Sequence, residues 1–122
     1  PLTLDGQGWS MKYNLLWDKV LHLGLLPDSF YAAETASYLP RINTYGLPLD
    51  SRADYTKSDW ICWTARMADD PAVRAALIAP VAKELHETTS RVPFSDWYDT
   101  KTTRFVAFIG RSVQGGLFAL ML

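Results

Sequence analysis

The sequence is poor in the residues that most often bind metals or cross-link a chain. Of its 122 residues, one is a cysteine, Cys62, and two are histidines. A single cysteine can form no disulfide within the chain and has no companion for a C-x-x-C metal site. We therefore predict that Cys62 is a small buried apolar residue, and we expect neither a metal nor a cofactor.

The sequence also lacks an excess of charge of one sign. Its 12 basic and 13 acidic residues are scattered and give a formal net charge of −1. Without a basic stripe to neutralise phosphates, nucleic acid is not an expected partner. No glycine-rich phosphate loop, H-E-x-x-H or G-x-S-x-G motif occurs, so nucleotide chemistry, zinc proteolysis and the usual serine hydrolase arrangement are unsupported.

Long hydrophobic runs are missing as well. The apolar stretch over residues 115–122 is too short to span a membrane, and residues 1–10 lack the charged and apolar regions of a secretory signal. We expect a soluble chain with no membrane partner. Aromatic residues are plentiful at 13%, and many lie next to aspartates, which is typical of a binding cleft.

Apolar residues recur at helical spacing in several segments, so the sequence predicts an all-α fold in a single domain over residues 1–122. A proline inside the fourth segment, Pro80, predicts a kink or break near Ala79. A weak strand pattern covers 103–109. The short connections predict antiparallel helical hairpins. The expected helices cover residues 9–25, 28–40, about 60–67, 72–87 and 113–122.

Three local patterns add detail to these helices. Asp18 and His22 are four residues apart, which predicts a surface pair. The spacing of Thr56 and Asp59 matches a capping box for the third helix. In the last segment, Gly115-Gly116 would allow another part of the backbone to approach closely.

Two polar, aromatic segments without helical period follow the predicted hairpins. The first ends in Ser58-Asp59-Trp60, and the second, within 92–103, contains Ser95-Asp96-Trp97. The two triplets are 37 residues apart, an interval that fits one hairpin with its connections. If the hairpins stack side by side, both segments emerge at the same rim and the two aspartates become neighbours.

Two carboxyl groups in one cleft can divide acid and base work when their surroundings separate their pKa values. Asp59 and Asp96 are thus the candidate catalytic pair; alternatively, Asp59 caps a helix and Asp96 caps a turn. Arg52 and Lys57 are candidate clamps for a substrate carboxylate, and the alternative is that they form structural ion pairs. The aspartates available for such pairs are Asp50, Asp54 and Asp99.

Four motifs carry a family resemblance. They are YNLLWDK at 13–19, YGLPLDSRADYTKSDW at 45–60, VPFSDWYDT at 92–100 and RSVQGGLF at 111–118. In this order they resemble the C-terminal part of the glutaminase A family of secreted fungal and bacterial proteins. The segment FIGRSV, 108–113, departs from the more usual wording F-Q-A-R-x-V, which leaves the role of that loop in question.

The resemblance implies a partial arc of an α/α toroid of the six-hairpin glycosidase type, in which loops at one rim form the site. The chain would be a C-terminal fragment, with helix faces open to the N-terminal part of the same protein or to self-association. The resemblance also implies an extracellular protein. The motif positions that it makes candidates for the site are Asp50, Arg52, Tyr55, Lys57, Asp59, Trp60, Asp96, Trp97 and Asp99.

The activity implied by the resemblance is hydrolysis of L-glutamine to L-glutamate and ammonia. Because enzymes that cleave sugars share this fold, a small polar substrate, glutamine or sugar, is expected. A carbohydrate-active protein and a non-catalytic structural or binding module are the alternatives.

Overall fold

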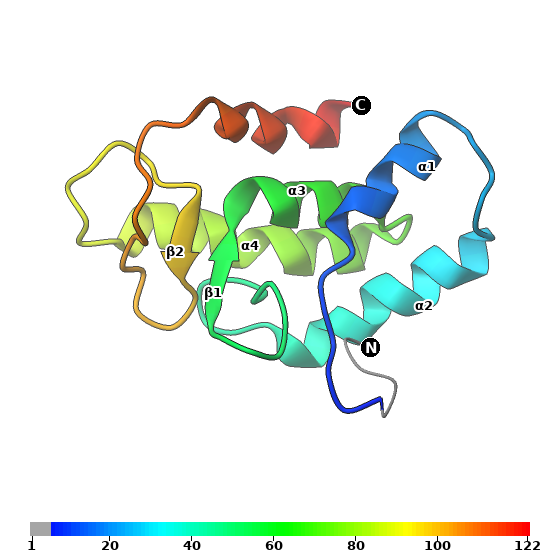
Figure 1. Cartoon of the computed structure of the whole chain (residues 1–122), viewed down its shortest axis with the longest axis horizontal. Helices are drawn as coiled ribbons and strands as arrows, with labels where there is room; N and C mark the ends of the chain where they lie inside the picture. The colour runs from blue at the N-terminus through cyan, green and yellow to red at the C-terminus, as the bar shows by residue number, and fades with distance from the viewer. Residues whose placement is uncertain (1–5) are drawn as a thin grey trace.

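The structure is a computed structural model that describes residues 6–122. In Figure 1, α3 and α4 run side by side through the middle of the molecule, α1 and α2 lie at one end, and η3 packs along α3. The elements in chain order are η1 (Tyr13–Leu15), α1 (Leu16–Val20), α2 (Asp28–Tyr38), η2 (Leu39–Arg41), β1 (Tyr55–Lys57), α3 (Ser58–Met67), α4 (Pro71–Glu87), β2 (Trp97–Asp99) and η3 (Ser112–Met121).

The helices agree with the predicted class, but the expectation of an all-α chain misses a small sheet. Strands β1 and β2 pair antiparallel at the end of the molecule away from α1 and α2 (Figure 1). Thr56 and Tyr98 face each other across the ribbon and are both buried, which anchors it to the core. The segment predicted as a strand over 103–109 forms no strand; it follows β2 through an isolated bridge between Phe105 and Tyr98 and through the Val106 N–H, which donates to the Trp97 carbonyl at 2.8 Å.

The first predicted helix, 9–25, is much shorter in the structure. Before η1 the chain is tied to the first polar segment, because the Met11 N–H donates to the Leu49 carbonyl at 2.7 Å. After α1 the chain leaves the helix through two residues in the left-handed region, His22 (φ 53°) and Gly24 (φ 68°). Both ends of the predicted helix are therefore used for turns and long-range contacts.

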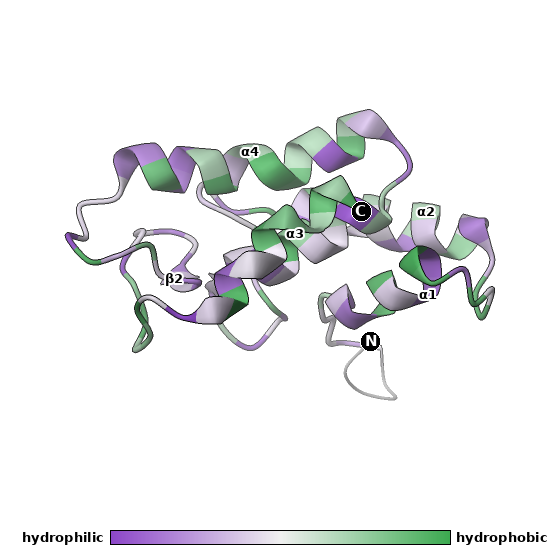
Figure 2. Cartoon of the chain, turned by 90° about the horizontal axis from the view of Figure 1, so that it is seen from above, coloured by the Kyte–Doolittle hydropathy of each residue, from purple (hydrophilic) through white to green (hydrophobic). Residues whose placement is uncertain are grey.

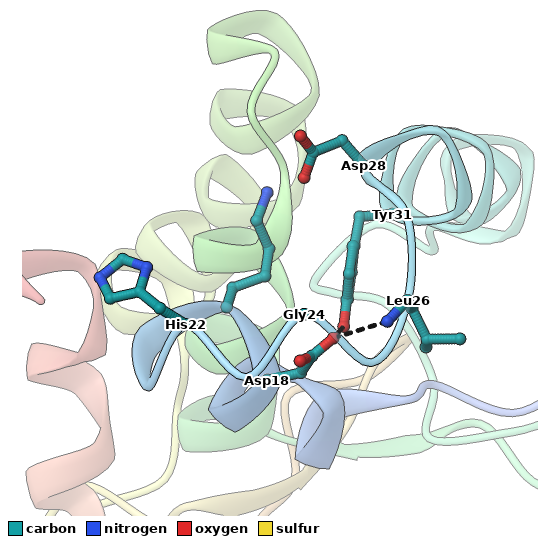
Figure 3. A pocket seen from close by; sticks show the side chains of 7 residues that line it. Asp18, His22, Gly24, Leu26, Asp28 and Tyr31 are labelled. Atoms are coloured by element: carbon teal, nitrogen blue, oxygen red, sulfur yellow. Dashed lines mark hydrogen bonds between the residues drawn. The ribbon is translucent and has the colours of Figure 1, made fainter.

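The predicted surface pair of Asp18 and His22 is wrong. Asp18 is buried, and its carboxylate accepts hydrogen bonds from the Leu25 N–H at 2.9 Å, the Leu26 N–H at 3.1 Å and the Tyr31 hydroxyl. His22 is exposed and its side chain lies away from Asp18 (Figure 3). Asp18 instead holds the turn between α1 and α2, and the Tyr31 hydroxyl is the main cause that lowers its pKa.

Helix α4 begins as the sequence predicts but isn't broken at Pro80. Pro71 occupies the first turn, and the Asp70 carboxylate caps the helix by accepting from the Ala72 N–H at 2.8 Å. Val73, Leu77 and Val81 are buried at successive i+4 positions on both sides of Pro80. Their packing keeps the helix continuous although the proline removes one backbone hydrogen bond.

Helix α3 is the centre of the fold because it contributes to both hydrophobic clusters. Ile61 and Ala65 pack with Leu77 of α4, while Met67 packs with Tyr31 of α2. Cys62 is buried at 5% exposure, as predicted. Figure 2, viewed from above, shows α3 and α4 with apolar residues along their lengths. Among residues 6–122, none of the helices has the length and apolar character needed to cross a membrane.

Candidate functional site

The two Ser-Asp-Trp triplets lie side by side because β1 and β2 pair just where the triplets occur. The antiparallel register places Lys57 opposite Trp97. Beyond it, the Ser58 N–H donates to the Asp96 carbonyl at 2.8 Å. Strand pairing thus brings together two triplets that are 37 positions apart in the sequence, where stacking of hairpins was expected.

Asp96 is fully buried and is held by two cations. Arg111 donates two hydrogen bonds to it, from Nε to Oδ1 at 3.1 Å and from Nη2 to Oδ2. The Lys57 ammonium lies 3.8 Å from Oδ2. A buried carboxylate is stable only when it is paired and hydrogen-bonded, and the planar guanidinium supplies both at once.

The Lys57 ammonium is enclosed by aromatic rings as well as by Asp96. It lies 5.0 Å from the centre of the Trp60 ring, 5.2 Å from that of Trp97 and 5.3 Å from that of Phe108. Each ring face attracts a cation at this range. Its side chain is 14% exposed, so one edge of this cluster reaches solvent.

Asp59 is also buried, at 3% exposure, but its surroundings differ from those of Asp96. Oδ1 of Asp59 has no hydrogen-bond partner among the described residues. Burial, and next the charge of Asp96, raise the pKa of Asp59, while the N–H groups of Asp59 and Trp60 and the Lys57 ammonium act in the opposite direction. The charge of Asp96 thus acts on the carboxyl group of Asp59.

Helix η3 covers Asp59. A Cβ added to Gly116 would lie 2.9 Å from the Asp59 Cβ and 2.7 Å from Nε1 of Trp63, so only glycine fits there. The close approach predicted for Gly115-Gly116 is confirmed for Gly116; a Cβ on Gly115 would meet nothing within 4 Å. With Asp96 also buried, neither carboxyl group of the pair is open to solvent.

The capping box predicted from Thr56 and Asp59 is wrong. Lys57 occupies the N-cap position of α3, and no side chain makes a capping hydrogen bond there. Strand β1 continues to Lys57 and turns Thr56 toward the core, where its hydroxyl has no partner among the described residues. The carboxyl group of Asp59 is consequently not used as a box partner.

The aromatic candidates form the walls of the cluster. Trp60 stacks on Tyr13 with ring centres 3.9 Å apart, and Trp97 packs edge-on against Tyr55 at 5.2 Å. Nε1 of Trp97 is buried and has no partner in the part of the chain that the structure describes. Tyr13, which sequence reasoning did not select, has a raised pKa because of burial and, second, the charge of Asp59.

Asp50 and Arg52 lie at another cavity, of about 330 Å³. Nη2 of Arg52 is 2.6 Å from Oδ2 of Asp50, and Nε donates to Oδ1 at 2.9 Å. The structure thus shows the ion pair that was the alternative for Arg52. Asp99 holds a turn by accepting from the N–H groups of Lys101 and Thr102 at 2.9 and 2.8 Å.

A cavity of about 280 Å³ between α1 and α2 is lined by Asp18, His22 and Tyr31 (Figure 3). Two of its charged groups are already used, since Lys19 pairs with Asp69 at 2.6 Å and Asp18 holds the turn. Within residues 6–122, no three His, Cys, Asp or Glu side chains gather closely enough to hold a metal ion. This cavity is a structural feature of the turn.

Arg111 is the main residue of the Asp59–Asp96 site that sequence reasoning missed. It begins the motif RSVQGGLF, but the sequence of its loop, FIGRSV, departs from the more usual F-Q-A-R-x-V. The sequence therefore assigned this loop no role. Phe108, in the same loop, was not selected either, although the Arg111 guanidinium carbon lies 4.0 Å from the centre of its ring. Arg111 belongs to a motif that the sequence shows, whereas its partner, Asp96, could be found only from the fold.

Comparison with known proteins supports the family named by the motifs. A family model described as the glutaminase A six helical-hairpin domain matches residues 4–121. Glutaminase A of Aspergillus oryzae is 40% identical over 113 residues, which are 90% of this chain and 16% of that protein. A protein of Arthroderma benhamiae named a probable glutaminase is 36% identical over 101 residues, 80% of this chain and 12% of that protein.

The chain therefore spans less than a fifth of the length of these curated relatives. No solved structure matches it significantly. Because the family model covers almost the whole chain, the chain belongs to the glutaminase A six helical-hairpin family.

Proposed function

We propose that this chain forms part of a glutaminase A-like hydrolase that cleaves the side-chain amide of L-glutamine to L-glutamate and ammonia. The site would be the pair of Asp59 and Asp96, one of which would activate water or protonate the leaving ammonia. The observation that carries this proposal is the buried pair itself, in which one carboxyl group is bound by two cations and the other has a free oxygen and a raised pKa. Such unequal environments are what acid–base catalysis requires of two carboxyl groups.

Substrate must be able to reach this pair. Both carboxyl groups are covered, so a substrate contacts them only when η3 or the loop carrying Arg111 moves aside. Helix η3 is suited to such movement: Ala119 is its one buried residue among those described, and 3₁₀ hydrogen bonds are weaker than α-helical ones. The exposed part of the cluster, beside Lys57 and Arg111, is where a substrate would enter.

Lys57 is better placed than Arg52 to hold the α-carboxylate of glutamine. Arg52 is bound to Asp50 and is 76% exposed, whereas the ammonium of Lys57 lies within the aromatic cluster beside Asp96. An incoming carboxylate could share the Lys57 charge at its exposed edge. The remaining motif positions, Tyr55, Trp60, Trp97 and Asp99, would shape the walls of the pocket.

The wider setting of this site also belongs to the proposal. We place the chain in an arc of an α/α toroid in an extracellular protein, where further hairpins would cover its exposed apolar residues. Trp17, Phe118 and Leu122, which line a cavity of about 300 Å³ next to Trp63, are such residues. The match to a six helical-hairpin family model supports the presence of further hairpins.

The test uses the protein in the longest form that its gene encodes. Ammonia release from L-glutamine is measured beside release of reducing sugar from a panel of glycans, which separates the glutaminase from the carbohydrate-active alternative. Asp59→Asn and Asp96→Asn should each lower the rate of ammonia release at least about a hundredfold if these groups do acid–base work. Turnover near that of the wild type in both variants would exclude the proposed site.

A further inference from the structure

The buried site contains two carboxyl groups and two cations, and both cations contact the same carboxyl group. The fork of Arg111 is hydrogen-bonded to both oxygens of Asp96, and Lys57 is 3.8 Å from one of them. Asp59 forms no ion pair with any residue in the described part of the chain, and its Oδ1 has no hydrogen-bond partner there. The division of charge between the two groups is thus built into the geometry.

The titratable and charged groups around Asp59 come from every side of the site. Helix η3, which lies directly over Asp59, contains no charged or titratable residue in its sequence SVQGGLFALM. The neighbours whose charge acts on Asp59, or on which the charge of Asp59 acts, are Tyr13 of η1, Lys57 of β1, Cys62 of α3, Asp96 before β2 and Arg111 before η3.

Two of these neighbours are neutral near pH 7. The pKa of the Cys62 thiol is raised to about 11, first by burial and second by Asp59. The pKa of Tyr13 is raised for the same two reasons. Neither group can therefore supply a charge to Asp59 at neutral pH, so the charges that act on it are those of Asp96, Lys57 and Arg111.

We propose that Asp59 is the carboxyl group that exchanges a proton with the substrate, and that Arg111 is a positioning residue that acts through Asp96, which it keeps as a fixed anion. This inference rests on the proposed function for the reaction, and on the geometry alone for the location of the proton. A carboxylate bound by a bidentate guanidinium and a nearby ammonium is a weak base. The carboxyl group with a free oxygen and no cation of its own is the one that can take up and release a proton.

The amide hydrolysis then needs one proton-exchanging residue. Water attacks the amide carbon of glutamine, a carbon–oxygen bond forms, and Asp59 accepts the proton that the water loses. The tetrahedral intermediate collapses, the carbon–nitrogen bond breaks, and Asp59 gives the same proton to the leaving nitrogen, which departs as ammonia. Asp59 returns to its initial state, while Asp96, Arg111 and Lys57 remain charged throughout.

The experiment follows the two carboxyl groups directly by NMR. The chain is labelled with ¹³C at the aspartate carboxyl carbons, the signals are assigned with Asp59→Asn and Asp96→Asn, and the shifts are recorded as a function of pH. We expect Asp59 to titrate above the usual range of an aspartate carboxyl group, because it is buried and has no cation of its own. The proposal is overturned if Asp59 titrates within that range or below it.

The role of Arg111 is tested by the same titration. Arg111→Met should move the titration of Asp59, because Asp96 loses its fork, whereas Arg111→Lys keeps the charge and should leave the titration of Asp59 closer to that of the wild type. Arg104→Met is the matched control, since Arg104 is exposed and forms no ion pair with the described residues. A titration of Asp59 that is unchanged in Arg111→Met overturns the positioning role, and the wild-type titration decides the proton location even if that variant does not fold.

The titration requires no substrate, so it can fail independently of the proposed function. Absence of ammonia release from the longest form of the protein would reject the glutaminase proposal and leave the location of the proton standing. A titration of Asp59 within the usual aspartate range would reject Asp59 as the exchanging group even in a protein that releases ammonia.

Discussion

The two Ser-Asp-Trp triplets are identical in sequence, yet the structure uses them in different ways. Ser58-Asp59-Trp60 begins helix α3, whereas Ser95-Asp96-Trp97 leads into strand β2. The Ser95 hydroxyl is hydrogen-bonded to the Trp97 and Phe108 carbonyls at 2.8 and 2.5 Å. The Ser58 hydroxyl is buried and has no partner among the described residues.

The two aspartates differ as the two serines do, because the second triplet again has more partners. Asp96 has two cations and a complete set of partners, whereas Asp59 lies under η3 with one oxygen free. A triplet in the sequence therefore does not determine the chemistry of its carboxyl group. The backbone around it and the cations that long-range contacts bring to it determine that chemistry.

The largest effect should come from removing the charge of Asp96. Asp96→Asn leaves Arg111 and Lys57 without their counter-ion in a buried site, so we expect the free energy of unfolding to fall by about 3 kcal/mol. Asp59→Asn is the matched comparison. It removes a buried carboxyl group that has no ion pair, and at pH 7 it should leave stability unchanged or raise it by up to about 1 kcal/mol.

Urea unfolding of both variants at several pH values checks this contrast. Because the folded pKa of Asp59 is raised, its favourable contribution is present at low pH and is lost as pH rises through that pKa. The difference between Asp59→Asn and the wild type should thus vanish in acid and grow toward neutral pH. Equal losses of stability in the two variants would show that the two triplets are equivalent.

Glu84 sharpens the comparison, because it is a third buried carboxyl group and, like Asp59, has no cation. It is 4% exposed, its Oε2 has no partner among the described residues, and burial raises its pKa to about 7. The folded state binds this proton more tightly than the unfolded state does. The contribution of Glu84 to stability is therefore full below about pH 4.5 and is lost as pH rises through about 7.

Glu84→Gln should remove this dependence. We expect the wild type to lose on the order of 2 kcal/mol over that pH range relative to the variant, as measured by urea unfolding. The matched control is Glu87→Gln, since Glu87 is exposed on the same helix and paired with Lys83. If the two variants show the same pH profile, a buried carboxyl group without a cation does not behave as we infer for Asp59.

The cover over Asp59 can be tested with the two glycines of η3. Gly116→Ala forces its new methyl group against Trp63 and Asp59, so we expect a loss of about 1–2 kcal/mol. Gly115→Ala is the control, because a Cβ there meets no atom within 4 Å. The melting temperatures of Gly116→Ala and Gly115→Ala are compared. Similar values would mean that η3 does not pack on the first triplet.

The smallest effect is expected at the ion pair outside the site. Arg52→Met breaks the contact with Asp50, but the arginine side chain is 76% exposed, and such pairs contribute roughly 0–1 kcal/mol. We expect a change in unfolding free energy below about 0.5 kcal/mol and normal ammonia release. A large loss of activity without loss of stability would return Arg52 to the substrate site.

The helices could be predicted because their signals are local. Pro71 at the start of α4 and the i+4 spacing of Val73, Leu77 and Val81 are read directly from the sequence. The neighbourhood of Asp59 and Asp96 could also be predicted, because the repeated triplets suggested a shared rim. The reason given for it was incomplete, since a strand ribbon joins the two segments.

The rest depended on contacts between distant residues. Asp18 has the spacing of a surface partner for His22, but the Tyr31 hydroxyl and the turn after α1 bury it. Arg111 is 15 positions from Asp96 in a segment without regular period, so no spacing rule connects them. The pairing of the two triplets, and the cations that contact their aspartates, are properties of the tertiary structure.

A double-mutant cycle tests most directly the central claim that the two triplets form one electrostatic unit. The free energy of unfolding is measured at pH 7 for the wild type, Asp59→Asn, Asp96→Asn and the double variant. In Asp96→Asn, the carboxylate of Asp59 can serve as the counter-ion of Arg111 and Lys57 in place of Asp96, so the double variant should lose about 1 kcal/mol more than the sum of the single changes. Additivity within about 0.5 kcal/mol would show that the two carboxyl groups are independent and would contradict the account.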